Sequence, residues 1–174
     1  MAGAVPTRIA WAVDRLSIRP DETLLEIGCG RGVAAGLVCA RLGEGRLVAI
    51  DRSDTAVAAA RAANAAWIAA GRLEVIAADM TGDALRDRRF DAVFAINVNL
   101  FWTAPDAAVP AVRGLLKPGG RLLLVYETPG RARAEDLAAR LPALLSAGGL
   151  TVAGVDLDPF GAPLLAAAAT RGAA

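Results

Sequence analysis

Three glycines at alternate positions mark the stretch that is best suited to hold a ligand, Glu26-Ile-Gly-Cys-Gly-Arg-Gly32. The apolar residues before it predict a buried strand over 23–27, and those after it predict a helix over 33–41. Glycines let the backbone turn tightly and leave room for a ligand to lie against it. The first N–H groups of the helix lack partners within the helix, so we expect them to face that ligand.

The spacing of these glycines differs from that of the dinucleotide-binding fingerprint G-x-G-x-x-G. Val33 stands at the third small position of that pattern, and the glycines instead follow E-x-G-x-G-x-G. The chain also lacks the Tyr-x-x-x-Lys pair of many nicotinamide-dependent oxidoreductases. Both observations argue against such an oxidoreductase, which we keep as the least favoured of the hypotheses considered below.

The composition limits the chemistry further. The 174 residues include no histidine, which removes the commonest general base and the commonest metal ligand. The two cysteines, Cys29 and Cys39, have neither zinc-site spacing nor the pattern of a disulfide framework, so we expect no metal. The net charge is +1, which gives no reason to expect a nucleic-acid partner.

The predicted location is the cytoplasm. Residues 1–9 lack the apolar core of a signal peptide, and no run of about 18 apolar residues predicts a membrane span. Two cysteines in reduced form fit the same compartment.

Strands and helices alternate along most of the chain. Further strands are predicted over 46–50, 72–77, 90–96, 121–126, 150–157 and 163–170. Further helices are predicted over 7–17, 54–70, 107–116, with Pro110 in its first turn, and 132–147, with a kink or break at Pro142. Residues 117–120 predict a turn.

This alternation predicts an α/β fold, with a mostly parallel sheet covered by helices on both faces. The last two strands have no helix between them, so they must form an antiparallel hairpin. We expect one domain over 1–174, in which the helical segment 1–20 covers the ligand cleft.

Polar residues follow several of the predicted strands. Asp51, Asp79, Asn97 and Asn99 come after the second, third and fourth strands. In an open α/β sheet, ligands bind outside the carboxyl ends of the strands. The order of these features resembles that of class I S-adenosylmethionine (SAM) dependent methyltransferases, as does the sequence LKPGGRLLLV at 116–125. The resemblance implies a Rossmann-like three-layer sandwich with seven strands in the order 3-2-1-4-5-7-6.

The resemblance also implies a set of cofactor-binding residues. Asp51 matches the acid that accepts from both ribose hydroxyls, Asp79 the acceptor from the adenine amino group, and Glu26 the acid near the methionyl end. The full set for SAM, or for its product S-adenosylhomocysteine (SAH), is Glu26, Gly28, Cys29, Gly30, Gly32, Asp51, Arg52, Asp79, Met80 and Asn97.

Each of these residues also has a purely structural interpretation. The glycines could serve the turn alone, and Asp51 could cap the following helix. Asp79 could be a loop carboxylate, and Asn97 and Asn99 could be turn residues. We expect Cys29 to be tolerated at its position because its side chain is small, and we expect its thiol to be unreactive.

The chemistry that the resemblance implies is in-line displacement at an activated methyl group, in which the protein mainly aligns the acceptor. A general base is optional, and catalytic candidates are Asn99, Tyr126 and Glu127, with Asp106 as a further acid. Glu127 fits a solvated loop acid better than a base. Phe101 and Trp102 either line the acceptor pocket or pack against the next helix.

The acceptor is expected to be a small molecule, because no basic run suggests a nucleic acid and no membrane segment is predicted. No insertion provides a lid, so the N-terminal segment or a second subunit of a homodimer must cover the site. The alternatives are a SAM-binding homologue without transfer activity and a methyltransferase that acts on a macromolecule.

Overall fold

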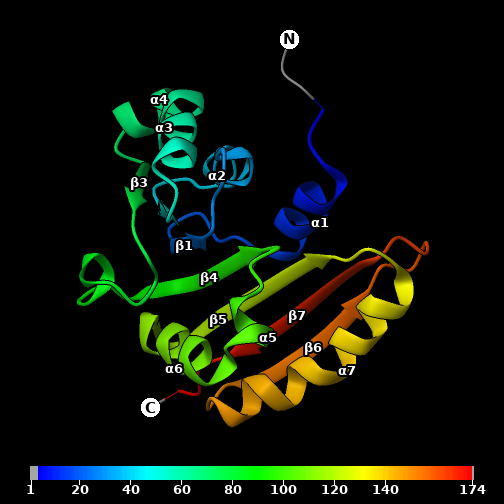
Figure 1. Cartoon of the computed structure of the whole chain (residues 1–174). Coiled ribbons are helices and arrows are strands. Elements are labelled where there is room, and N and C mark those ends of the chain that lie inside the picture. Colours follow the sequence, from blue (N-terminus) through cyan, green and yellow to red (C-terminus); the bar gives the residue numbers. More distant parts are fainter. Residues whose placement is uncertain (1–3, 174) are drawn as a thin grey trace.

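A seven-stranded sheet with the order β3-β2-β1-β4-β5-β7-β6 runs through the computed structural model, which describes residues 4–173 (Figure 1). The strands are β1 (Thr23–Ile27), β2 (Arg46–Asp51), β3 (Leu73–Ala77), β4 (Phe90–Ile96), β5 (Leu116–Glu127), β6 (Thr151–Leu157) and β7 (Leu164–Thr170). Strands β1 to β5 pair in parallel, whereas β7 is antiparallel to both β5 and β6. The predicted α/β sandwich, its strand order and its terminal hairpin are confirmed.

Helices cover both faces of this sheet (Figure 1). They are α1 (Thr7–Arg15), α2 (Val33–Cys39), α3 (Asp54–Ala63), α4 (Ala65–Ala69), α5 (Leu100–Thr103), α6 (Pro105–Leu115) and α7 (Arg131–Ala147), with a 3-10 turn η1 (Asp83–Leu85). In the described range 4–173, no helix is long and apolar enough to cross a membrane.

Two apolar clusters hold the layers together. One lies between the sheet and α1, α2 and α3, and includes Val13, Val38 and Phe94. The other lies between the sheet and α5, α6 and α7, and includes Phe101 and Leu141. Burial of both sheet faces explains why the central strands are continuous apolar runs rather than alternating ones.

The helix predicted over 54–70 is divided at Asn64 into α3 and α4, so the prediction of one helix was wrong there. The buried Asn64 amide group donates hydrogen bonds to the carbonyl oxygens of Ala60, at 2.9 Å, and Gly32, at 3.0 Å. Asn64 has φ −120° and ψ 24°, outside the helical region. The side chain thus interrupts the helix in order to bind the glycine loop.

Prolines and a turn account for the other differences. Pro105, not Pro110, stands in the first turn of α6, and α7 continues through Pro142 without a break. Residues 117–120 lie within β5, where the pairing with β4 shifts register between Phe90 and Ala92. The prediction of a turn over 117–120 was therefore wrong, because these residues form an irregular part of β5.

The N-terminal helix α1 packs on the same face as α2, and the first core cluster includes residues of both. The domain prediction over 1–174 and the cover over 1–20 include residues 1–3 and 174, which lie outside the described residues. Both statements remain predictions.

Candidate functional site

The glycine loop is tied to the end of β2 by its backbone. The amide groups of Gly28 and Cys29 both donate to the carbonyl oxygen of Ile50, at 2.8 and 2.9 Å. The amide of Gly32 donates to the Cys29 carbonyl at 2.9 Å. The loop therefore uses most of its own N–H groups within the protein, which leaves the first N–H groups of α2 as the donors expected to face a ligand.

Asp51 fixes the same loop through its side chain. Its Oδ2 accepts a hydrogen bond from the Gly30 amide at 2.9 Å, and its Oδ1 accepts from the Ser53 amide at 3.0 Å. The cap of α3 is Ser53, whose Oγ accepts from the Ala56 amide at 3.2 Å. Asp51 is thus free of the capping role, and its carboxylate stands beside the loop at the carboxyl end of β2.

The three glycines differ in what surrounds them, although all have positive φ. A Cβ at Gly28 would come within 2.6 Å of Val98, and one at Gly32 within 2.6 Å of the Asn64 amide nitrogen. A Cβ at Gly30 would meet nothing within 4 Å. Gly28 and Gly32 are therefore required by the packing of the protein itself, whereas Gly30 faces open space where a ligand can approach the backbone.

Glu26 is the buried acid of the site. It is 3% exposed, and its Oε2 has no hydrogen-bond partner in the part of the chain that the structure describes. Burial and, to a smaller extent, the nearby charge of Asp51 together raise the pKa of Glu26 to about 8. A buried carboxyl group without a partner is costly, so this oxygen is a natural acceptor for a polar ligand group.

Two cavities lie on either side of the glycine loop. The first is bounded by Ile27, Gly28, Ile50, Asp51, Arg52, Ala78, Asp79, Met80 and Leu100. The second, of about 310 Å³, is bounded by Pro6, Arg8, Ile9, Glu26, Gly28, Cys29, Gly30, Arg31, Val33, Ala34, Ile96 and Asn97. All ten predicted cofactor residues except Gly32 line one or both cavities.

The first cavity places two carboxylates at the ends of neighbouring strands. Asp79 Oδ1 accepts from the amide and the hydroxyl of Thr81, at 2.9 and 2.7 Å, and these hydrogen bonds lower the pKa of Asp79. The Arg52 charge also lowers it. Met80 is buried against the second core cluster and presents an apolar wall. The cavity thus combines ionised acceptors with an apolar surface.

Asn97 joins the ends of β4 and β5. It adopts a left-handed conformation with φ 57°, its amide donates to the Val125 carbonyl, and its Oδ1 accepts from the Glu127 amide, both at 2.8 Å. Asparagine tolerates this conformation better than most side chains. Asn97 also lines a third cavity, so it stands between the space beside Glu26 and that cavity.

This third cavity has a volume of about 620 Å³. It is bounded by Asn97, Asn99, Trp102, Tyr126, Glu127, Thr128, Pro129, Arg133 and Leu137. Of the aromatic pair considered from the sequence, Trp102 lines the cavity, whereas Phe101 is fully buried in the core. Sequence reasoning missed Thr128, Pro129, Arg133 and Leu137; their position just after the end of β5 is the signal that could have indicated them.

The three catalytic candidates, Asn99, Tyr126 and Glu127, all line this cavity, but they differ in their hydrogen-bond and ion-pair partners. The hydroxyl of Tyr126 donates to the Val98 carbonyl at 2.9 Å, and burial raises the pKa of Tyr126. Glu127 is exposed and forms an ion pair with Arg8 of α1 at 2.9 Å. The Asn99 carbonyl accepts from Thr103, as expected for a residue before a helix. Asp106 lies in the first turn of α6, away from the cavity wall.

Cys29 is buried beside Glu26, and burial together with the charge of Glu26 raises the pKa of its thiol to about 12. A thiol in this state is protonated at neutral pH and unreactive. Its contribution to the loop is therefore its size.

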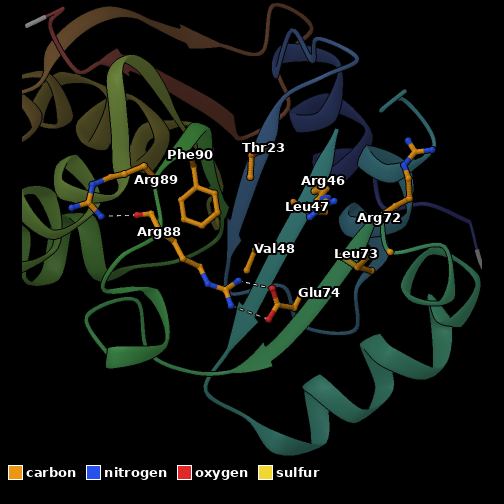
Figure 2. A pocket seen from close by; sticks show the side chains of 11 residues that line it. Thr23, Arg46, Leu47, Val48, Arg72, Leu73, Glu74, Arg88, Arg89 and Phe90 are labelled. Carbon is orange, nitrogen blue, oxygen red and sulfur yellow. Dashed lines mark hydrogen bonds and ion pairs between the residues drawn. The ribbon is translucent and has the colours of Figure 1, made fainter. Parts of the chain in front are cut away.

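A separate hollow lies at the opposite, amino ends of β1, β2, β3 and β4 (Figure 2). Thr23, Val48 and Phe90 line it, and the ion pair between Arg88 and Glu74 lies across it (Figure 2). It contains none of the residues of the glycine loop. Because ligands of parallel sheets bind at the carboxyl ends of the strands, we do not place the cofactor here.

The sheet order and the glycine loop together define a class I methyltransferase fold. Residues 24–120, more than half of the chain, match the family described as "Methyltransferase domain". The chain belongs to this family of SAM-dependent methyltransferases, and SAM is the cofactor of this family.

Named relatives agree with this assignment. The chain is 36% identical over 138 residues to a protein-L-isoaspartate O-methyltransferase of Methylorubrum populi, covering 79% of this chain and 60% of the relative. It is 30% identical over 113 residues to the ribosomal RNA small subunit methyltransferase H of Nitrosomonas europaea, covering 64% of this chain and 29% of the relative. The chain therefore spans less than two thirds of either relative.

A solved structure shares the fold. The N-methyltransferase NodS from Bradyrhizobium japonicum, in complex with SAH, superposes with a TM-score of 0.73 at 20% identity, covering 94% of this chain and 85% of that one. The residues present here fit SAM on independent grounds. The unpartnered Glu26 oxygen and the Asp51 and Asp79 carboxylates match its polar groups, and the open space over Gly30 lets a ligand approach the backbone.

Proposed function

We propose that this chain transfers the methyl group of SAM to a small-molecule acceptor that enters the cavity lined by Trp102 and Arg133. The observation that carries this proposal is the position of Asn97, which lines both this cavity and the one beside Glu26. If SAM were held between Asp51 and Glu26, Asn97 would lie between the cofactor and the cavity of Trp102 and Arg133.

We assign different residues of the site to the adenosyl and the methionyl parts of SAM. Asp51 and Asp79 would accept hydrogen bonds from the adenosyl part, and Met80 would supply an apolar surface beside the ring. Glu26 faces the methionyl part, and Gly30 lets the backbone approach it. When bound, SAM supplies a methyl group on a positively charged sulfur, which is already activated for transfer.

The contribution of the protein to the reaction is mainly alignment and exclusion of water. Tyr126 is held by Val98, and Glu127 is held by Arg8, so neither is placed as a ready base. Alignment of two reactants supplies a large part of a barrier reduction on its own. We therefore propose in-line transfer without an obligatory general base from this chain.

A small acceptor is favoured by the cavity itself. Residues of α7 line it on one side and the segment that contains Trp102 lines it on another, and its volume of about 620 Å³ suits a compact molecule. The names of the relatives cover both protein and ribosomal RNA acceptors, so the acceptor class rests on the cavity alone. The free cysteines Cys29 and Cys39 support the proposed cytoplasmic location.

Transfer from SAM with a labelled methyl group tests this function. The purified chain is incubated separately with the small-molecule, protein and RNA fractions of a bacterial extract. We expect label in the small-molecule fraction only. Label confined to protein or RNA would contradict the proposed acceptor class, and SAH binding without label in any fraction would favour the non-catalytic homologue.

A further inference from the structure

The cavity next to Asn97 has one strongly basic feature that the methyl transfer does not use. Arg133, in the first turn of α7, lines the cavity together with Trp102 and Leu137. The Cζ atom of Arg133 lies 5.2 Å from the centroid of the Trp102 ring. A cation thus stands beside a flat aromatic wall.

The present partner of Arg133 leaves this cation available. Its Nη1 donates to Asp136 Oδ2 at 2.7 Å, and the two side chains are 44% and 48% exposed. Exposed ion pairs of this kind contribute little to stability. A planar guanidinium has several donors in a fork that suits a carboxylate, so it can bind a second anion from the cavity side.

The acidic group on the same wall does not oppose an anion strongly. Among the described residues that line the cavity, Glu127 is the one with an acidic side chain. Its Oε2 is paired with Arg8 Nη1 at 2.9 Å. The first turn of α7 contains no acidic residue. The acids that follow on α7, Glu135 and Asp136, are paired with Arg131 and Arg133. Arg133 is therefore the cation that an anionic ligand group in this cavity would meet.

The indole N–H of Trp102 lacks a hydrogen-bond acceptor among the described residues. Its Nε1 is buried and has no acceptor within residues 4–173. A buried donor without an acceptor is unfavourable, so an oxygen of a bound molecule would be a favourable partner for it. Beyond this nitrogen the wall is apolar, with Leu137 buried behind it.

We propose that the acceptor is a small planar acid whose carboxylate pairs with Arg133 and whose ring or other flat body packs against Trp102 and Leu137. This inference rests on the proposed function, because it names the substrate class of the same site. Arg133 acts here as a specificity-determining residue, and the end of the acceptor opposite its carboxylate faces Asn97.

The test compares matched neutral and anionic probes. Binding of 4-hydroxybenzoate, 4-hydroxybenzamide and 4-hydroxybenzyl alcohol is followed by the NMR signal of the Trp102 indole N–H, with and without saturating SAH. The chain has three tryptophans, so Trp102→Phe identifies the signal. We expect 4-hydroxybenzoate to bind about tenfold more tightly than either neutral probe, as for a charge-assisted pair.

Arginine variants locate the preference. Arg133→Gln should reduce the preference for the acid to about twofold or less, and Arg133→Lys should retain part of it. Arg140→Gln is the matched control, because Arg140 lies on the same helix and also approaches Asp136, at 3.7 Å, but does not line the cavity. It should leave the preference unchanged.

Three results would overturn the inference: equal affinity for the acid and the neutral probes, a Trp102 signal that no probe shifts, or a preference that survives in Arg133→Gln. SAH binding is measured separately by calorimetry. Failure of SAH to bind would contradict the proposed function, whereas the preference for the acid is still measured in the protein without SAH. The two failures are thus distinguishable.

Discussion

The carboxylate of Asp51 accepts a hydrogen bond from the amide of Gly30 at 2.9 Å, and this contact joins the carboxyl end of β2 to the middle of the glycine loop. The second oxygen accepts from the Ser53 amide. A carboxylate has about four acceptor positions, so two remain for a ligand. One residue thus shapes the loop and offers an ionised acceptor beside it.

Replacement of Asp51 should weaken cofactor binding. Asp51→Ala removes charge-assisted hydrogen bonds, and we expect a loss of about 2–3 kcal/mol in the free energy of SAH binding. Asp51→Asn keeps one oxygen acceptor and should lose less. Calorimetric titration with SAH measures both.

The control is Asp54→Ala, which removes an exposed carboxylate three residues further along and lies outside the cavity. It should bind SAH as the parent does. Equal SAH affinities for Asp51→Ala and Asp54→Ala would show that Asp51 only shapes the loop.

Two glycines of the same loop should respond differently to alanine. At Gly32 a Cβ would come within 2.9 Å of Ala60 and closer still to Asn64, at φ 77°. We expect Gly32→Ala to lower the free energy of unfolding by about 2–4 kcal/mol, through strain and overpacking. Gly30→Ala has open space and should cost about 1–2 kcal/mol, for its left-handed backbone alone.

The two variants should rank in the opposite order for SAH binding, which is measured under conditions where both are folded. Gly30→Ala places a methyl group in the space that a ligand is expected to occupy, so it should weaken SAH binding by about tenfold or more. Urea denaturation and calorimetry provide the two readouts. Gly30→Ala with the SAH affinity of the parent would remove Gly30 from the binding site.

Glu26 should make the stability of the ligand-free protein depend on pH. Its pKa is raised from 4.5 to about 8 by burial, so between these values the folded state keeps a proton that the unfolded state has released. The free energy of unfolding must therefore fall as pH rises through this interval, by up to about 1.4 kcal/mol per pH unit. Below the interval, the carboxyl group is protonated in both states and contributes no slope.

Denaturation at several pH values between 5.5 and 7.5 measures this slope. The chain has no histidine, so few other groups titrate in the same window. Glu26→Gln imitates the protonated carboxyl group and should remove most of the slope. An unchanged slope in this variant would assign the dependence to another group.

Cofactor binding should in turn release a proton. An ammonium group brought to the cavity beside Glu26 favours the charged carboxylate and lowers its pKa. Titration with SAH at pH 7, in two buffers with different ionisation enthalpies, should show net proton release to the buffer. Glu26→Gln should show much less, and equal release in parent and variant would contradict this coupling.

The sequence was most informative where burial and glycine geometry decide the structure. The apolar runs at 23–27 and 90–96 coincide with β1 and β4, and the lack of a helix after β6 required the hairpin. Asp51 and Asp79, which follow the predicted ends of two strands, line one cavity, and their role in binding stays a prediction. These are local features, because strand ends in a parallel sheet meet at one edge.

Side-chain contacts between distant segments were not predictable. Asn64 stands in an alanine-rich stretch with high helix propensity, yet its amide binds the Gly32 carbonyl and ends the helix. Arg133 and Leu137 reach the cavity only because α7 turns back along the sheet after β5. Such tertiary contacts override helix propensity at Asn64, and for Arg133 and Leu137 the local pattern indicates at most that they follow the end of β5.

A crystal structure of the complex with SAH would show directly where the cofactor binds. We expect the ribose hydroxyls at Asp51, the amino-acid part beside Glu26, and the sulfur at Asn97 facing the cavity of Trp102 and Arg133. SAH bound in the hollow at the amino ends of the strands, or with its sulfur turned away from Asn97, would contradict this expectation.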